Sequence, residues 1–130
     1  MRMTARRALT ALGVALAAVG VPQAGGAVAG ELVMFQSRSC AWCAAWELEV
    51  GTVYEKTDEA RTLTLRRVDA DRDRTGGIKL AAPVEFTPTF VIVACGRELG
   101  RIAGYPGEDH FWGLLGTEIA RHRAGLVAPC

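Results

Sequence analysis

The sequence predicts an α/β domain with a mixed four-stranded sheet, helices on both faces of that sheet, and a cleavable signal peptide in front of it. Three observations support this prediction: an export signal at the start, a strand-helix-strand order followed by a hairpin and a last helix, and two cysteines where the first strand passes into the first helix. A strand-helix-strand unit implies parallel pairing with a right-handed crossover, and a hairpin adds antiparallel strands.

The segment 1–29 has the composition of a secretory signal peptide. Three arginines come before an apolar stretch from residue 8 to about residue 21, and small residues end at Ala29. A permanent membrane anchor needs roughly 18 or more unbroken apolar residues, and glycine, proline and glutamine interrupt this stretch. We expect cleavage after Ala29, which leaves a domain of residues 30–130, and export by either the general route or the twin-arginine route.

From residue 30 onward acidic side chains slightly outnumber basic ones. This balance favours neither nucleic acid nor an anionic membrane as a partner. The segment has the commonest size of a single domain, which is large enough to bury a core of its own. We therefore expect one exported, monomeric domain.

The first half of this domain is predicted to form a strand, a helix and a strand. The run 31–36 is almost continuously apolar, which is typical of a central strand buried on both faces. From 41 to about 57 apolar residues recur at helical spacing, after a polar turn in which Ser39 is a suitable N-cap. The run 63–68 predicts a second strand, and its paired arginines indicate an exposed sheet edge.

The second half is predicted to form a loop, a hairpin and a last helix. The polar stretch 69–83 is expected to be a loop with a short helical piece inside it. Strands over 86–93 and 98–103 flank Cys95-Gly96, which suits a tight β-hairpin. The run 108–123 has an apolar stripe, acidic residues at its start and basic ones at its end, as the helix dipole prefers.

The chemistry that the sequence predicts centres on Cys40-Ala41-Trp42-Cys43. Cys40 lies at the predicted helix start, where unpaired backbone N–H groups stabilise a thiolate. Cys43 follows on the same helix face but further inward, so its sulfur can reach that of Cys40. We expect Cys40 to attack a partner's disulfide and Cys43 to resolve the mixed disulfide that forms.

The same spacing also occurs in metal sites, haem-attachment sites and inert disulfides. Ala44 stands where a haem-binding pair has its histidine, and the other two cysteines lack the paired spacing of a zinc site. A structural bridge across so short a loop would constrain the unfolded chain little. We expect no cofactor beyond the redox-active pair. The alternative, from a different class of function, is a metal-binding carrier that uses Cys40 and Cys43 as ligands.

Cys95 and Cys130 are expected to lie together, at the end of the domain opposite the CxxC pair. If Pro88 lies beside that pair, the strand after it runs away from the pair, and the last helix returns the chain end to the same far side. A second, structural disulfide between Cys95 and Cys130 is therefore geometrically possible, and two free thiols are the alternative.

The CxxC pair after a strand, together with Thr87-Pro88 before a hairpin strand, resembles the thioredoxin superfamily. Four blocks resemble one branch of it more closely, the SoxS thioredoxins of sulfur-oxidising bacteria, and together they span nearly all of the predicted domain. These blocks are 40–46, 66–69, 86–90 and 100–112.

The resemblance implies a thioredoxin-like domain that exchanges thiols and disulfides in the periplasm. Its substrate would be the cysteine-bearing sulfur carrier of the Sox system, and electrons would come from a membrane thiol transporter. It also implies a cis bond before Pro88, beside the reactive sulfur, and pairing of the Thr87 backbone with the substrate chain. Tyr105 and Pro106 would line the docking groove, and Trp42 would lie either at the substrate rim or in the core.

Two departures from ordinary thioredoxins leave the direction of electron flow open. The dipeptide between the cysteines is Ala-Trp instead of Gly-Pro, and Met34 stands where thioredoxins carry a buried, proton-accepting aspartate. A reductant of one partner and a general disulfide oxidase or isomerase are therefore both compatible with the sequence. The redox potential of the Cys40–Cys43 couple would distinguish between them.

Overall fold

The computed structural model describes Gly20 and residues 30–130, so the predicted signal peptide lies, apart from Gly20, outside the described residues. The strands are β1 (Gly30–Gln36), β2 (Leu63–Asp69), β3 (Thr89–Ala94) and β4 (Arg97–Ala103). The helices are α1 (Ala41–Trp46), α2 (Asp58–Thr62) and α3 (Glu108–Val127), with the π-helical turn η1 (Glu47–Gly51) and the 3-10 turn η2 (Tyr54–Lys56) between α1 and α2.

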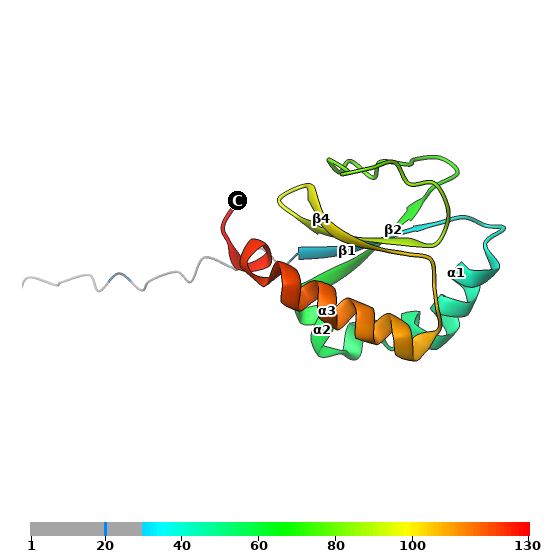
Figure 1. Ribbon diagram of the computed structural model, residues 1–130, viewed down its shortest axis with the longest axis horizontal. Helices are drawn as coiled ribbons and strands as arrows, with labels where there is room; N and C mark the ends of the chain where they lie inside the picture. Colours follow the sequence, from blue (N-terminus) through cyan, green and yellow to red (C-terminus); the bar gives the residue numbers. More distant parts are fainter. Residues whose placement is uncertain (1–19, 21–29) are drawn as a thin grey trace, which may run out of the picture.

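The four strands form one mixed sheet in the order β2-β1-β3-β4 (Figure 1). β1 pairs in parallel with β2 and antiparallel with β3, and β3 pairs antiparallel with β4. The predicted mixed four-stranded sheet is therefore confirmed, with β1 in its centre and β2 at an edge. Successive side chains of a strand point to opposite faces, so Leu32 and Met34 join one core and Val33 and Phe35 join the other.

All the described helices pack on one face of the sheet, which corrects the prediction of helices on both faces. Aromatic contacts hold this layer together: the ring of Phe90 on β3 lies 5.1 Å from that of Trp46 and 4.9 Å from that of Phe111. The opposite face is covered by the segment 70–88, whose Val84 packs in the second core (Figure 1). The helical piece predicted within 69–83 is absent, and the prediction was wrong on this point too.

Arginine side chains hold the irregular segment 70–88 in place. They donate to its backbone carbonyls, which a helix would have satisfied internally, and charge-assisted bonds of this kind are stronger than neutral ones. The bonds run from Arg66 to Gly76 (3.1 Å), from Arg74 to Val84 (3.0 Å), and from Arg101 to Ala82 (2.7 Å) and Pro83 (3.1 Å).

The helix predicted over 41–57 is interrupted in its second half. α1 ends at Trp46, and in η1 the N–H of Thr52 donates to the carbonyl of Glu47, five residues earlier, at 3.1 Å. A Cβ at Gly51 would collide with the Glu47 carboxylate and lie 3.2 Å from the Trp46 ring. Glycine therefore fits this close approach, and its low helix propensity agrees with the end of the regular helix here.

β3 and β4 form the predicted hairpin, with Cys95 and Gly96 in its turn. Both residues have positive φ angles, 52° and 72°, as a two-residue hairpin turn of this type requires. Cys95 is joined to Cys130 by a disulfide whose Cα atoms are 5.5 Å apart. The bridge fastens the chain end after α3 to the hairpin turn, at the end of the sheet away from α1 (Figure 1).

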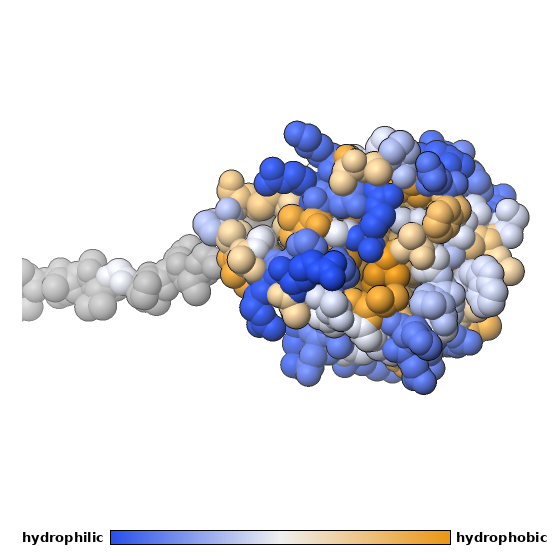
Figure 2. All heavy atoms as spheres, viewed as in Figure 1, coloured by the Kyte–Doolittle hydropathy of each residue, from blue (hydrophilic) through white to orange (hydrophobic). Residues whose placement is uncertain are grey.

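α3 begins at Glu108, as predicted, but it runs past Gly125 to Val127. A Cβ at Gly125 would lie 3.2 Å from the Leu99 side chain of β4, so glycine at this position allows close packing of α3 on β4. On the face shown in Figure 2, apolar side chains gather between β4 and α3 and are bordered by hydrophilic ones. Within residues 30–130, no helix combines the length and the apolar character that a membrane crossing needs.

Replacing Cys130 by Ser should destabilise the domain. The Cys95–Cys130 bridge closes a loop with a sequence separation of 35, and a bridge of that span typically contributes about 2–4 kcal/mol by restricting the unfolded chain. Urea unfolding without reductant measures the change, with Ala128→Ser in the same tail as the control. A Cys130→Ser variant with the midpoint of the wild type would contradict a closed bridge.

Candidate active site

The two cysteines of the CxxC pair lie where β1 passes into α1. The N-cap residue of α1 is Cys40 and not the predicted Ser39, because Cys40 has the extended backbone and accepts the capping bond. Cys40 and Cys43 form a disulfide with Cα atoms 5.2 Å apart. The two sulfurs are therefore adjacent, as a reversible thiol-disulfide couple needs.

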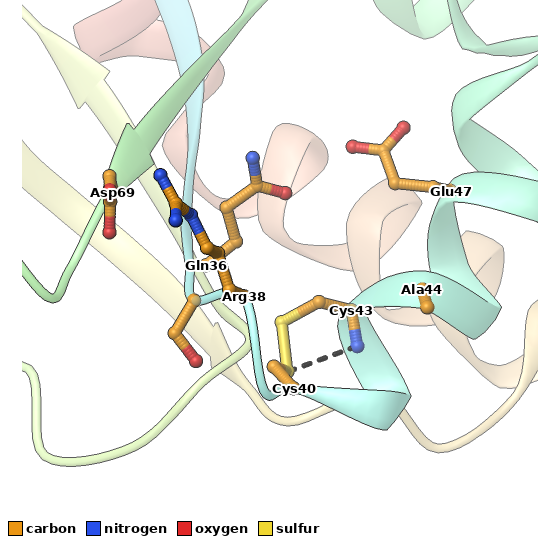
Figure 3. Close-up of a pocket in the computed structure, with 8 residues that line it drawn as sticks. Gln36, Arg38, Cys40, Cys43, Ala44, Glu47 and Asp69 are labelled. Carbon is orange, nitrogen blue, oxygen red and sulfur yellow. Dashed lines mark hydrogen bonds between the residues drawn. A yellow bond between two sulfur atoms is a disulfide. The ribbon is translucent and has the colours of Figure 1, made fainter.

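The backbone of α1 favours negative charge on Cys40. The N–H of Cys43 donates to the Sγ of Cys40 at 3.1 Å (Figure 3). When the couple is reduced, a donor in this position stabilises a thiolate on Cys40. Cys43 is only 3 % exposed, whereas Cys40 is half-buried. Cys40, whose thiolate the backbone stabilises, is thus also the more accessible of the two cysteines.

The loop that precedes β3 lies beside Cys40. The hydroxyl oxygens of Thr87 and Ser37 are 3.3 Å apart and share a hydrogen bond, which joins this loop to the turn before Cys40. The peptide bond between Thr87 and Pro88 is cis. The structure therefore brings Thr87-Pro88 next to the CxxC pair, although the two segments are far apart in the sequence.

Two surface hollows meet at Cys40. The first, of about 360 Å³, is also lined by Cys43, Arg38 and Glu47 (Figure 3). The second, of about 410 Å³, is lined by Trp42, Phe86 and Thr87. Cys40 lines both hollows and Cys43 lines only the first. A partner that occupies the second hollow therefore contacts Cys40 but not Cys43.

Two exposed aromatic side chains stand at the second hollow. Trp42 is 65 % exposed and Phe86 is 54 % exposed, which places Trp42 at the rim and not in the core. The place of Phe86 at this site was not predicted from the sequence, because its apolar side chain suited the start of a strand. Its position directly before Thr87-Pro88 is the signal that could have indicated it. Exposed aromatic groups beside a reactive sulfur offer apolar contact area to a partner.

Tyr105 and Pro106 line neither hollow. The Tyr105 ring is buried, with its centroid 6.1 Å from that of Phe111, and its hydroxyl donates to Glu49 of η1. Burial, and then the bond to the Glu49 carboxylate, raise the pKa of Tyr105 above its usual value, so the hydroxyl keeps its proton. Tyr105 therefore fastens η1 to the loop before α3, while a substrate contact of the exposed Pro106 stays a prediction.

An ion pair that was not predicted from the sequence fixes η1, directly after α1, to the edge of the sheet. Arg67 of β2 donates to both carboxylate oxygens of Glu47, at 2.5 and 2.8 Å. The hydrogen bond to Glu47 raises the pKa of Arg67 above its ordinary value.

Met34 is fully buried among apolar residues, so its position offers Cys43 no proton acceptor.

Comparison with known proteins places this site in a family. No family model matches the chain, and no curated protein matches it. The solved structure of the periplasmic thioredoxin SoxS from Paracoccus pantotrophus, in its reduced form, is 42 % identical with a TM-score of 0.67, over 71 % of this chain and 97 % of that one. A thioredoxin from Malassezia sympodialis is 18 % identical with a TM-score of 0.50, over 68 % and 74 %, and supports the fold alone.

The mixed sheet, the Cys40–Cys43 disulfide at the start of α1 and the similarity to a SoxS thioredoxin define a thiol-disulfide oxidoreductase of the thioredoxin superfamily. The identity of 42 % extends over almost the whole of the solved SoxS chain. The chain therefore belongs to the SoxS thioredoxins, as its four sequence blocks indicated.

Trp42→Ala should slow the reduction of a disulfide-bonded protein such as insulin by about tenfold, the usual cost of losing an aromatic contact at a docking site. The reduction of a small disulfide, which needs no docking surface, should stay within about twofold. The matched control is Leu48→Ala, because Leu48 is 77 % exposed and lines neither hollow. Equal effects of Trp42→Ala on both substrates would argue against docking at this rim.

Proposed function

We propose that this protein exchanges disulfides through Cys40 as the attacking thiolate and Cys43 as the resolving thiol. The observation that carries the proposal is the 3.1 Å hydrogen bond from the Cys43 N–H to the Cys40 sulfur. In the reductive direction, the Cys40 thiolate attacks one sulfur of the partner's disulfide, and the partner's other sulfur leaves as a thiolate. Cys43 then gives up its proton and attacks Cys40, which restores the Cys40–Cys43 disulfide and releases the partner reduced by two electrons.

We propose the cysteine-bearing sulfur carrier of the Sox system as the partner. The proposal rests on membership of the SoxS thioredoxins and on the second hollow, where Trp42, Phe86 and Thr87 offer a docking surface beside Cys40. An extended segment of the partner would pair with the backbone at Thr87, before Pro88, as a strand adds to an open edge.

The compartment and the electron source belong to the same proposal. The composition of residues 1–29 supports export, and the similar solved SoxS is a periplasmic thioredoxin. In the periplasm a membrane thiol transporter would return electrons to the couple after each turnover. We propose that the domain works there as a monomer without a further cofactor.

Two other functions differ from this one in a measurable property. A general disulfide oxidase or isomerase would have a reduction potential well above that of the glutathione pool, and a reductant would lie well below it. A carrier that binds metal through Cys40 and Cys43 would take up Cu(I) or Zn(II) tightly, and Cys43→Ala would abolish the binding. Within residues 30–130, no group of three or more His, Cys, Asp and Glu side chains is placed to hold a metal ion.

Cys43→Ser should trap the partner on Cys40 as a mixed disulfide, because the resolving thiol is absent. Isolation of the adduct from native extract, followed by mass spectrometry with and without reductant, identifies the trapped protein. Cys40→Ser is the control and should trap nothing. One defined carrier protein would support a dedicated reductant, whereas a broad mixture of unrelated proteins would contradict it.

A further inference from the structure

The irregular segment that leads to Thr87-Pro88 lies along the edge strand β4 before it reaches the active site. The N–H of Lys79 donates to the carbonyl of Gly96 at 2.8 Å, and the N–H of Glu98 donates to the carbonyl of Lys79 at 3.1 Å. The segment thus begins to pair with β4 several residues before the loop that contacts Cys40.

Two side chains of β4, Glu98 and Arg101, continue this contact, and we call them the β4 clasp. Glu98 accepts the N–H of Ala81 at 2.7 Å and two N–H groups of Arg101 at 2.6 and 2.8 Å. Arg101 also donates to the carbonyls of Ala82 and Pro83, at 2.7 and 3.1 Å. Three consecutive residues of the segment are therefore bound by one pair of side chains.

The β4 clasp is charged, with a buried carboxylate and a partly exposed guanidinium. The Glu98 side chain is 4 % exposed and the Arg101 side chain is 23 % exposed. Burial acts to raise the pKa of Glu98, but the bonds from Arg101 and Ala81 outweigh it and hold the pKa below its ordinary value. The stabilisation is therefore present at neutral pH and is lost only as the pH falls through that lowered value.

The residues held by the β4 clasp lie a short distance from the substrate loop. Arg74 fixes the carbonyl of Val84 at 3.0 Å, directly after the residues that Arg101 holds. Only Glu85 separates Val84 from Phe86, so the Cα atoms of these two residues are at most about 7 Å apart. On the other side, Thr89 begins β3. The positions of Phe86 and Thr87 relative to Cys40 therefore depend on where the clasp holds this segment.

We propose that Glu98 and Arg101 are positioning residues for disulfide exchange, which hold the loop Phe86–Pro88 in place for a protein substrate. This inference rests on the proposed function, because it assumes that the substrate docks beside Cys40. A loosened clasp would leave the sulfur chemistry of Cys40 and Cys43 intact and would weaken the docking surface next to it.

Arg101→Gln and Glu98→Gln test the proposal with two substrates. For a disulfide-bonded protein such as insulin, the KM should rise about fivefold or more while kcat changes little, because small displacements of positioning groups have large effects. For a small aromatic disulfide, which needs only the two sulfurs, the rate should stay within about twofold. Arg101→Lys keeps the positive charge but loses the forked N–H donors of the guanidinium, so its KM should lie between that of the wild type and that of Arg101→Gln.

Arg66→Gln is the matched control. Arg66 also pairs with a carboxylate, that of Glu31 at 2.9 Å, and donates to the same segment, at Gly76, but it holds the start of the segment and not the end beside Cys40. The Arg66→Gln substitution should lower the free energy of unfolding without raising the KM for the protein substrate. An unchanged KM in both clasp variants, or an equal rise in Arg66→Gln, would overturn the proposal. A wild-type protein whose Cys40 fails to react with the small disulfide would overturn the proposed function with it.

Discussion

The proposed chemistry of this protein depends on one hydrogen bond, from the backbone N–H of Cys43 to the Sγ of Cys40. It exists because Cys40 is the N-cap residue of α1: its extended backbone turns the chain from β1 into the helix and aims its side chain at the first turn. N-cap residues normally accept this hydrogen bond through the side-chain oxygen of Ser, Thr, Asp or Asn. The sulfur of a cysteine in the same position accepts it too, and the bond stabilises that cysteine in its thiolate form. The Glu47–Arg67 and Tyr105–Glu49 bonds hold the helical segment that carries this turn.

The distribution of helices explains how the second part of the site is built. Because all the described helices pack on one face, an irregular segment covers the other, and irregular backbone needs partners for its carbonyls. Arginines supply them, and the last of these bonds lie next to the loop that reaches Cys40 through Thr87 and Ser37. The same contacts that replace a helix therefore also hold the loop at which we propose that a substrate docks.

The sequence predicted the parts of this structure whose signals are local. Apolar runs and helical spacing gave the strands and α3, Cys95-Gly96 gave the hairpin turn, and the CxxC spacing gave the reactive pair. It failed to predict the end of α1 at Trp46. It also failed where groups distant in the sequence decide, since the segment 70–88 stays irregular because side chains of β2 and β4 bind it. The exposure of Phe86 and the burial of Tyr105 were not predicted either, since burial is a property of the packed molecule.

The most direct test is the pH dependence of the alkylation rate of Cys40 in the reduced protein, compared with free cysteine under the same conditions. Mass spectrometry of the peptides assigns the modified residue. We expect the Cys40 rate to reach half its maximum at a pH well below about 8.5, the pKa of an unperturbed thiol, and Cys43 to be modified far more slowly. A midpoint at or above that of free cysteine, with both thiols modified at similar rates, would contradict it.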